Sequence, residues 1–409
     1  MTRRVFIKAG GLALVSLGIA PSFLARTVEA AGRQRKLLIA IFQRGAVDGL
    51  NMIVPYGEAD YYRSRPSIAI ARPGASGGAV DLDGFFGLHP RLSPLHPFWL
   101  DGSLAVVHAC GSHDGTRSHF DAQDYMESAT PGVKSTRDGW INRYLQVEPD
   151  AVANPLRAVS LTRTMPRALQ GRAPTLAVGR VDEFGVRGGM GAGASFEAAY
   201  AEAADRVLGG TASEAFDAMR TLRGATRGRY QAAHGADYPR SPFGQALQEI
   251  ARLAKADVGL EVAFAESGQW DHHVNQGGAT GQMANRLDDF ARGIAALARD
   301  LGERLADTVI LSMSEFGRAV SENGNRGTDH GHGNAMLLIG GSVKGRRVYG
   351  PWPGLRPEAR FEGRDLAVTT DFRDVFAEVL VRHLGVDRDT GAQVFPSYGI
   401  GPRNFLGLL

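Results

Sequence analysis

Residues 36–42 read KLLIAIF, a short, continuous apolar run that is typical of a β-strand buried on both faces. Four later runs share this length and character: 103–110 (SLAVVHAC), 260–265 (LEVAFA), 308–313 (TVILSM) and 335–339 (AMLLI). Amphipathic stretches alternate with these runs. The pattern therefore predicts an α/β protein in which helices cover both faces of a mostly parallel central sheet.

The expected helices are recognised by their apolar spacing. Between residues 283 and 301, apolar side chains recur in steps of four and three. Ser241 and Pro242 mark the start of a second helix, and residues 372–380 form a third stripe. Residues 151–240 mix short strand-like pieces with Gly-rich turns, and we interpret them as an insertion or cap on the sheet.

The first thirty residues predict an export signal. Residues 1–8, MTRRVFIK, match the twin-arginine motif Ser/Thr-Arg-Arg-x-Phe-Leu/Ile-Lys at every position. The following apolar run is short and interrupted by glycine, so it spans about 30 Å of hydrocarbon poorly. We expect cleavage after Ala30 and a mature chain, 31–409, that is periplasmic or secreted. The Tat translocase is then the export partner, and we expect no membrane span in the mature chain.

Charge and cysteine content limit the classes of protein to which this chain can belong. The formal charge is +3. The leader carries four basic residues and one acidic residue, so its removal leaves a neutral chain and no argument for nucleic acid as a partner. Cys110 is the sole cysteine, which rules out an intrachain disulfide. A redox protein would explain Tat export, but the chain has no CxxC pair or haem motif.

Histidine traces the expected site. Seven of the eleven histidines fall in three segments that follow predicted strands: 108–129, 268–276 and 312–341. In α/β sheets, ligands bind beyond the carboxyl ends of the strands. Residues 43–55 (QRGAVDGLNMIVP) follow the first strand in the same way and add a carboxylate.

Carboxylates and imidazoles at these strand ends are the candidate metal ligands. The set consists of Asp48, Asp271, His273, Glu315, Asp329, His330 and His332. Such a mixture suits one or two divalent ions, namely Zn²⁺, Mn²⁺, Mg²⁺, Ca²⁺ or Fe²⁺. An ordinary turn also explains an isolated Asp48 between glycines.

Other side chains in the same segments are candidates for substrate contact and catalysis. Arg44, Arg117 and Arg318 could bind the anionic oxygens of a substrate. His119 lies in a segment whose histidine spacing of five and six matches no finger-type zinc pattern, so we assign it to substrate contact. A polar surface loop that leads into a helix is the alternative interpretation of this segment.

Five motifs resemble the Tat-exported proteins of domain-of-unknown-function family 1501. They are RGAVDGLN, SHFDAQDYMESA, WDHHVNQ, SEFGRAVSENGNRGTDHGHGN and TTDFRDVF, and they span almost the whole mature chain. The family is grouped with the alkaline phosphatase and sulfatase superfamily. The resemblance implies a three-layer α/β/α sandwich with metal ligands at strand ends. The superfamily's ligand order corresponds here to Asp48, the Asp271–His273 segment, Glu315 and the Asp329–His330 segment.

The sequence also departs from that superfamily. Its covalent nucleophile, a Ser, Thr or modified Cys soon after the first metal Asp, has no counterpart, because Gly49, Leu50 and Asn51 follow Asp48. We therefore expect a metal-dependent hydrolase that attacks a phosphate or sulfate ester through metal-activated water. The alternative is a non-catalytic exported protein that keeps the fold and binds an envelope component.

Overall fold

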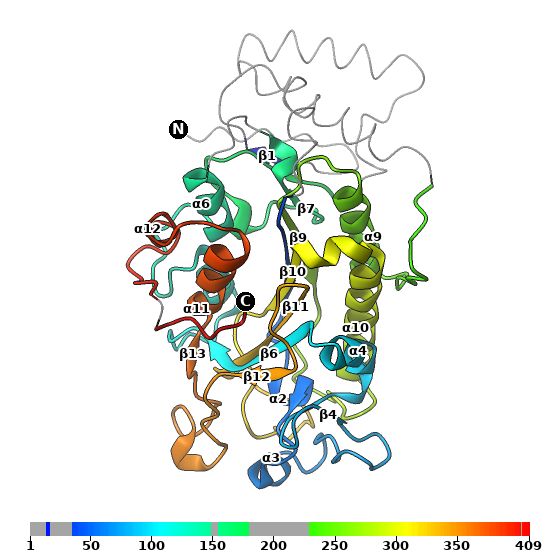
Figure 1. Ribbon diagram of the computed structural model, residues 1–409. Coiled ribbons are helices and arrows are strands. Elements are labelled where there is room, and N and C mark those ends of the chain that lie inside the picture. Colours follow the sequence, from blue (N-terminus) through cyan, green and yellow to red (C-terminus); the bar gives the residue numbers. More distant parts are fainter. Residues whose placement is uncertain (1–13, 17–34, 149–153, 180–228, 402) are drawn as a thin grey trace.

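The computed structural model describes residues 14–16, 35–148, 154–179, 229–401 and 403–409 (Figure 1). Its centre is a ten-stranded sheet in the order β1-β8-β7-β9-β2-β10-β11-β6-β12, with β13 paired to β6. The strands are β1 (Leu14–Ser16), β2 (Leu37–Gln43), β6 (Leu104–Gly111), β7 (Ala158–Ser160), β8 (Thr175–Ala177), β9 (Val262–Ser267), β10 (Thr308–Met313), β11 (Asn334–Gly340), β12 (Arg347–Tyr349) and β13 (Thr370–Asp371).

Most strand pairs in this sheet are parallel. Strand β2 pairs in parallel with both β9 and β10, and β7 pairs in parallel with β8 and β9. Antiparallel pairs join β1 to β8, and β11 to both β10 and β6. The predicted α/β class with a mostly parallel sheet is confirmed.

The helices cover the sheet on two sides (Figure 1). One side carries α4 (His96–Leu100), α9 (Pro242–Lys255) and α10 (Gln282–Leu301), and the other carries α6 (Trp140–Val147), α11 (Phe372–Glu378) and α12 (Arg388–Ala392). Strand β2 contributes to both cores because its side chains alternate. Ile39 and Ile41 pack with the α9–α10 side, whereas Leu38 and Phe42 pack with the α6–α11 side. The result is three layers.

The direction of β11 corrects one expectation. The run 335–339 was predicted as a buried parallel strand, and it is buried, but it is antiparallel to both neighbours. A parallel connection needs a crossover of about a dozen residues or more, usually a helix, that returns the chain to the opposite edge. The 314–333 connection stays at the carboxyl edge of β10 instead, so the chain re-enters the sheet from that edge.

The remaining elements are short. Helices α2 (Gly49–Met52), α3 (Ala59–Ser64) and α5 (His119–Ser128) follow strands at the carboxyl edge, and β3 (Ile53–Val54), β4 (Val80–Asp81) and β5 (Gly87–Leu88) form a second, three-stranded sheet. Short 3-10 helices and one π-helix complete the set: η1 (Pro90–Leu95), η2 (Pro155–Arg157), η3 (Arg167–Leu169), η5 (Gly302–Asp307), η6 (Pro357–Ala359) and the π-helical η7 (Val379–His383).

The expected leader and insertion are covered only in part. Most of residues 1–30 lies outside the described residues, although Leu14–Ser16 forms strand β1. Within 151–240, β7 and β8 are strands of the central sheet, while 180–228 lies outside the described residues. Among the helices that the structure describes, none is long and apolar enough to cross a membrane.

Candidate metal centre

Three imidazoles and one carboxylate meet at the carboxyl edge of the sheet. His119 begins α5 after β6, Asp271 and His273 lie in the loop after β9, and His330 precedes β11. The Nε2 atom of His330 lies 3.0 Å from Nε2 of His119 and 3.0 Å from Nε2 of His273. Asp271 Oδ1 lies 2.8 Å from His273 Nε2 and 3.2 Å from His330 Nε2. These four residues are candidate ligands of a metal ion and are called the metal centre below; the ligand atoms of His119, Asp271 and His330 all lie within 4.8 Å of one another.

The other nitrogen of each ring faces an oxygen atom. Nδ1 of His119 donates to Glu315 Oε1 at 2.8 Å, and Nδ1 of His330 donates to the carbonyl of Arg117 at 2.9 Å. Nδ1 of His273 lies 3.5 Å from Asp329 Oδ1. When Nδ1 carries the proton, a neutral ring presents the lone pair of Nε2. The three Nε2 atoms therefore converge as acceptors.

Converging acceptors fit a cation. Two unprotonated nitrogens 3.0 Å apart repel each other unless a proton or a metal ion lies between them. Ligands of a tetrahedral Zn²⁺ with bonds of about 2.0–2.1 Å are about 3.3 Å apart, close to the distances of 3.0–3.2 Å that His330 Nε2 makes with His119, His273 and Asp271. Metal-bound histidines usually donate their second nitrogen to a carboxylate or carbonyl, as His119 and His330 do here, while Nδ1 of His273 lies 3.5 Å from Asp329 Oδ1. The group of His119, Asp271 and His330 could thus hold one divalent ion such as Zn²⁺, with His273 beside it.

Asp271 is held in its charged form. Burial alone would raise its pKa, but the hydrogen bond and charge of Arg318, together with His273 and His119, lower the pKa to about 2. Arg318 Nη2 lies 2.6 Å from Asp271 Oδ1. The guanidinium is buried and also donates to the carbonyls of Gly45, Ala46, Trp270 and Thr328. Arg318 therefore forms hydrogen bonds to the loop after β2, the loop after β9 and the 314–333 connection, and so fixes their relative positions.

Glu315 orients His119 from a buried position. Its Oε1 accepts from His119 Nδ1, Gln123 Nε2 and the amide of Gly45, each at 2.8 Å. Burial would raise the pKa of Glu315, but these hydrogen bonds lower it. Phe316 packs behind the rings, with its centroid 4.9 Å from that of His119 and 5.1 Å from that of His330. Glu315 and Phe316 together fix the position of the His119 ring.

Glycines in the loop after β2 and in the 314–333 connection allow the backbones around the metal centre to approach one another closely. A Cβ on Gly45, whose φ is +110°, would lie 2.9 Å from the Asp271 amide nitrogen. A Cβ on Gly331 would overlap the backbone of Arg318, and one on Gly317 would overlap the carbonyl of Gly333. The interleaved glycines of 312–341 therefore serve the tight packing of this loop.

Asp48 does not join the metal centre. Its Oδ2 forms a fully buried ion pair of 2.5 Å with Arg65 and accepts from Gln276 Nε2 at 2.6 Å. Arg65 Nη1 also donates to Asn51 Oδ1 at 2.8 Å. The guanidinium supplies the positive charge that we had expected from a metal ion at Asp48.

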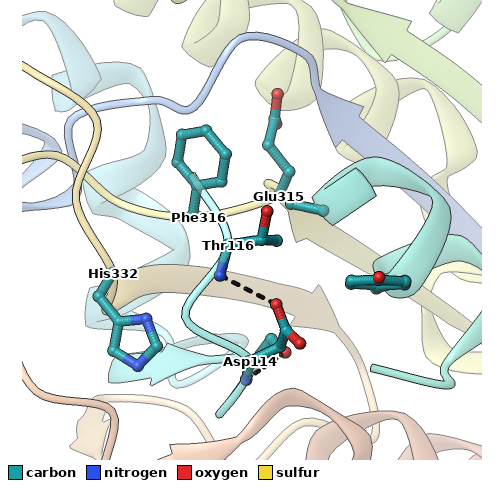
Figure 2. A pocket seen from close by; sticks show the side chains of 8 residues that line it. Asp114, Thr116, Glu315, Phe316 and His332 are labelled. Atoms are coloured by element: carbon teal, nitrogen blue, oxygen red, sulfur yellow. Dashed lines mark hydrogen bonds between the residues drawn. The ribbon is translucent and has the colours of Figure 1, made fainter. Parts of the chain in front are cut away.

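Glu315, Asp329 and His332 were also predicted as ligands, and the structure places them differently. Glu315 and Asp329 face the Nδ1 atoms, on the outer side of the rings. His332 stacks on Phe361 with centroids 4.0 Å apart, and burial lowers its pKa to about 4. His332 lines a small pocket whose opposite side carries the Glu315 carboxylate, as Figure 2 shows.

The three arginines that we expected to bind an anion are engaged by carboxylates. Arg44 pairs with Glu127 and Glu266, each at 2.6 Å. Arg117 pairs with Glu362 at 2.6 Å and Asp365 at 2.7 Å, and Arg318 pairs with Asp271 as described.

One residue of the site was assigned another role from the sequence, and a residue beside it was not singled out. His119 was assigned to substrate contact, whereas the structure makes it part of the metal centre. Arg364 was not singled out, yet it donates to the carbonyl of His330 and to Asp365 Oδ1, and its side chain is 46% exposed. The stretch around Arg364 contains no histidine and follows no predicted strand, so the strand-end rule could not find it.

The chain was compared with known proteins. It matches no curated protein sequence. Among solved structures it is similar to the C-terminal periplasmic domain of EcEptC from Escherichia coli, in complex with Zn, at 11% identity and a TM-score of 0.37. That match covers 76% of this chain and 74% of the other. It is also similar to the PsFucS1 sulfatase from Pseudoalteromonas sp., at 14% identity and a TM-score of 0.38, covering 97% of this chain and 77% of the other.

Both TM-scores lie below 0.5, so the description of the fold rests on the sheet topology itself. The family comparison is more extensive. A family model, described as protein of unknown function (DUF1501), matches residues 101–394, a range that contains every residue of the metal centre. The chain therefore belongs to the DUF1501 family.

Proposed function

We propose that the chain is an exported, metal-dependent hydrolase of a phosphate or sulfate ester. The observation that supports this most is the convergence of three Nε2 atoms on Asp271, with every Nδ1 turned toward an oxygen atom. When bound, a divalent ion supplies positive charge that polarises a phosphoryl or sulfuryl oxygen and acidifies water.

Four side chains would bind the ion, and two further side chains hold these ligands in place. His119, Asp271, His273 and His330 would hold the ion. Arg318 keeps the Asp271 carboxylate ionised and oriented at 2.6 Å, and Glu315 keeps the His119 proton on Nδ1. A centre whose ligands are fixed in advance needs little rearrangement when it loads or when charge develops on a substrate.

We propose a single ion for each chain. A second site would need Asp48, which is neutralised by the buried guanidinium of Arg65 at 2.5 Å. Replacing that guanidinium would mean breaking a buried ion pair, at a cost of about 3–5 kcal/mol.

Arg364 is the proposed contact for the anionic oxygens of the substrate. It lies beside His330 and is half-exposed, in contrast to buried Arg318. A guanidinium presents several N–H donors in one plane, and its two contacts with the protein leave donors for a phosphate or sulfate group. We expect Arg364→Ala to raise KM more than it lowers kcat.

Export by the Tat translocase to the periplasm or beyond is part of the same proposal. It is supported by the MTRRVFIK motif. The Tat route carries folded proteins, which suits a chain whose metal ligands come from three separate segments. A fusion of residues 1–30 to a reporter, with Arg3 and Arg4 both changed to Lys, tests this step, because retention of export in the variant would contradict it.

The hydrolase proposal is tested by metal analysis and an ester panel on the same protein. We expect the wild type to bind about one zinc ion per chain and to hydrolyse at least one phosphate or sulfate ester. His330→Ala should lose both properties. The matched control is His113→Ala, because His113 lies in the same sequence segment as His119 but is 62% exposed and pairs at 3.9 Å with Asp371.

The outcomes separate the two candidate functions. Full metal occupancy without turnover of any ester would contradict the hydrolase and support a non-catalytic binding protein that keeps the metal. The absence of a hydroxyl or thiol at Gly49, Leu50 and Asn51 is the observation that favours this second candidate. Loss of zinc in both histidine variants, or in neither, would contradict the metal centre itself.

A further inference from the structure

Two arginines beside the metal centre share one buried carboxylate. Asp365 is fully buried, and its Oδ2 atom accepts from Arg117 Nη2 at 2.7 Å and from Arg117 Nε at 3.1 Å. Its Oδ1 atom accepts from Arg364 Nε at 3.0 Å. The two guanidinium groups lie close together because they bind the two oxygens of one carboxylate. We call Arg117 and Arg364 the arginine pair, and Asp365 balances only one of its two positive charges.

Both residues of the arginine pair form a hydrogen bond with His330 of the metal centre. The Arg117 carbonyl accepts from Nδ1 of His330 at 2.9 Å, and Arg364 donates to the His330 carbonyl. Both side chains also reach the surface, since Arg117 is 28% exposed and Arg364 is 46% exposed. The arginine pair is therefore accessible to an anion from solvent and is bonded directly to a candidate metal ligand.

Glu362 balances the second positive charge of the pair. Its Oε2 atom lies 2.6 Å from Arg117 Nη2, the same nitrogen that binds Asp365. Unlike Asp365, the Glu362 side chain is 57% exposed. An exposed ion pair strengthens association by no more than about fivefold. An anion from solvent can therefore replace the Glu362 carboxylate at little cost, whereas the buried carboxylate of Asp365 stays in place.

The backbone holds Glu362 at the tip of a tight turn. The Phe361 amide donates to the Asp365 carbonyl at 2.9 Å, and the Asp365 amide donates to the Phe361 carbonyl at 3.0 Å. Within this turn Glu362 has a φ of +52°, in the left-handed region that a side chain disfavours and glycine adopts freely. A glutamate at a strained position of this kind points to a role for its side chain.

We propose that the arginine pair forms one anion site and that Glu362 is its built-in competitor. Without an anionic ligand, the Glu362 carboxylate binds Arg117. A phosphate or sulfate group replaces it and is then held by Arg117 and Arg364 together, because such a group offers more acceptor oxygens than a carboxylate. This inference rests on the proposed function, since it adds Arg117 to the contact assigned to Arg364 and describes how access to that contact is regulated.

Calorimetric titration of sulfate into zinc-loaded protein tests the competition. We expect Glu362→Gln to bind sulfate about twofold to fivefold more tightly than the wild type, because the neutral amide no longer competes for Arg117. The matched control is Glu358→Gln, which removes the same charge from an exposed residue in η6 of the same segment and should keep the wild-type affinity. No gain in Glu362→Gln, or an equal gain in both variants, would overturn the inference.

A second comparison shows whether Glu362 acts through Arg117. In an Arg117→Met background, where Arg364 still pairs with Asp365, the further change Glu362→Gln should leave the affinity for sulfate unchanged. A gain as large as in the presence of Arg117 would mean that Glu362 repels sulfate without competing for this guanidinium, and the inference would be overturned.

Ester turnover by the same proteins separates the inference from the function on which it rests. For an ester that the wild type hydrolyses, Glu362→Gln should lower KM and leave kcat near the wild-type value. If the sulfate affinities change as expected but no ester is hydrolysed, the competition is supported and the hydrolase proposal fails. If an ester is hydrolysed while Glu362→Gln keeps the wild-type KM and sulfate affinity, the hydrolase proposal stands and this inference fails.

Discussion

At the scale of single residues, the pair of Asp48 and Arg65 has the clearest energetic consequence. Both side chains are almost fully buried and lie 2.5 Å apart, and Arg65 also donates to the carbonyls of Ala319 and Val320. An uncompensated buried charge costs far more than an exposed one. The pair therefore anchors the α3 region against the 314–333 connection.

Removing the cation of this pair should destabilise the protein. We expect Arg65→Met to lower the free energy of unfolding by about 3–5 kcal/mol, because Asp48 would be left charged and buried. Urea denaturation at pH 7 measures the change. Arg63→Met is the control, since Arg63 is 68% exposed and pairs only with Asp60, and it should cost about 0–1 kcal/mol. Equal effects of the two variants would contradict the interpretation.

The sequence predicted part of the site at this scale. The strand-end rule selected Asp271, His273 and His330 because acids and imidazoles cluster after predicted strands. It could not predict that Arg65, in a loop without any such signal, neutralises Asp48. It also assigned His119 to substrate contact, because local spacing says nothing about rings that meet only when separate strand ends are brought together.

At the scale of elements, the 314–333 connection contains no helix and carries Glu315, Arg318 and His330. It leaves β10 and returns as β11 from the same edge, and its glycines allow it to fold onto itself. The sequence predicted both strands here but not their antiparallel pairing. An apolar run carries no information on direction, and the absence of a crossover helix became clear only from the structure.

Close packing in this connection gives a second prediction. A Cβ on Gly317 would overlap the carbonyl oxygen of Gly333, and neither backbone can yield easily. We expect Gly317→Ala to destabilise the protein by about 1–3 kcal/mol and to weaken zinc binding. Gly324→Ala is the control, because a Cβ there meets nothing within 4 Å, and it should stay within about 0.5 kcal/mol of wild type. The same cost for both variants would contradict the packing argument.

A third prediction concerns the packing of α9 and α10 against residues 229–238. Asp300 in α10 is fully buried and accepts from Tyr230, Tyr238, the Ala233 amide and Lys255. Burial alone would raise its pKa, but these donors lower the pKa below its usual value. A carboxylate of this kind adds stability above its unfolded pKa of about 3.9, and that stability is lost as the pH falls through the folded pKa.

Asp300→Asn should therefore cost about 2 kcal/mol at pH 7, and progressively less at low pH, where the wild-type carboxylate is also neutral. Chemical denaturation of both proteins between pH 7 and pH 3 measures the difference. A difference that stays constant or grows as the pH falls would show that the charge of Asp300 is not the stabilising feature.

At the scale of the whole molecule, the metal centre joins segments that are far apart in the chain. His119 follows β6, Asp271 follows β9 and His330 precedes β11, so an ion held by all three restrains three strand ends at once. A ligand that binds only the folded state stabilises it by mass action, by about 2.7 kcal/mol at a hundred times its Kd. Zinc should therefore raise Tm by several degrees.

This rise should depend on the complete set of ligands. We expect His119→Ala to abolish the zinc-dependent increase in Tm, while His113→Ala keeps it. Differential scanning calorimetry with and without added zinc measures both. An unchanged increase in His119→Ala would exclude His119 from the centre and return it to the role that the sequence alone suggested.

The most direct test of the metal centre is X-ray absorption spectroscopy at the zinc edge of the loaded wild-type protein. The structure predicts a shell of about three imidazole nitrogens and one carboxylate oxygen at about 2.0–2.1 Å, with the outer-shell scattering of three imidazole rings. A shell made of oxygen donors, or one with a single imidazole, would contradict the convergence of His119, His273 and His330 on one ion.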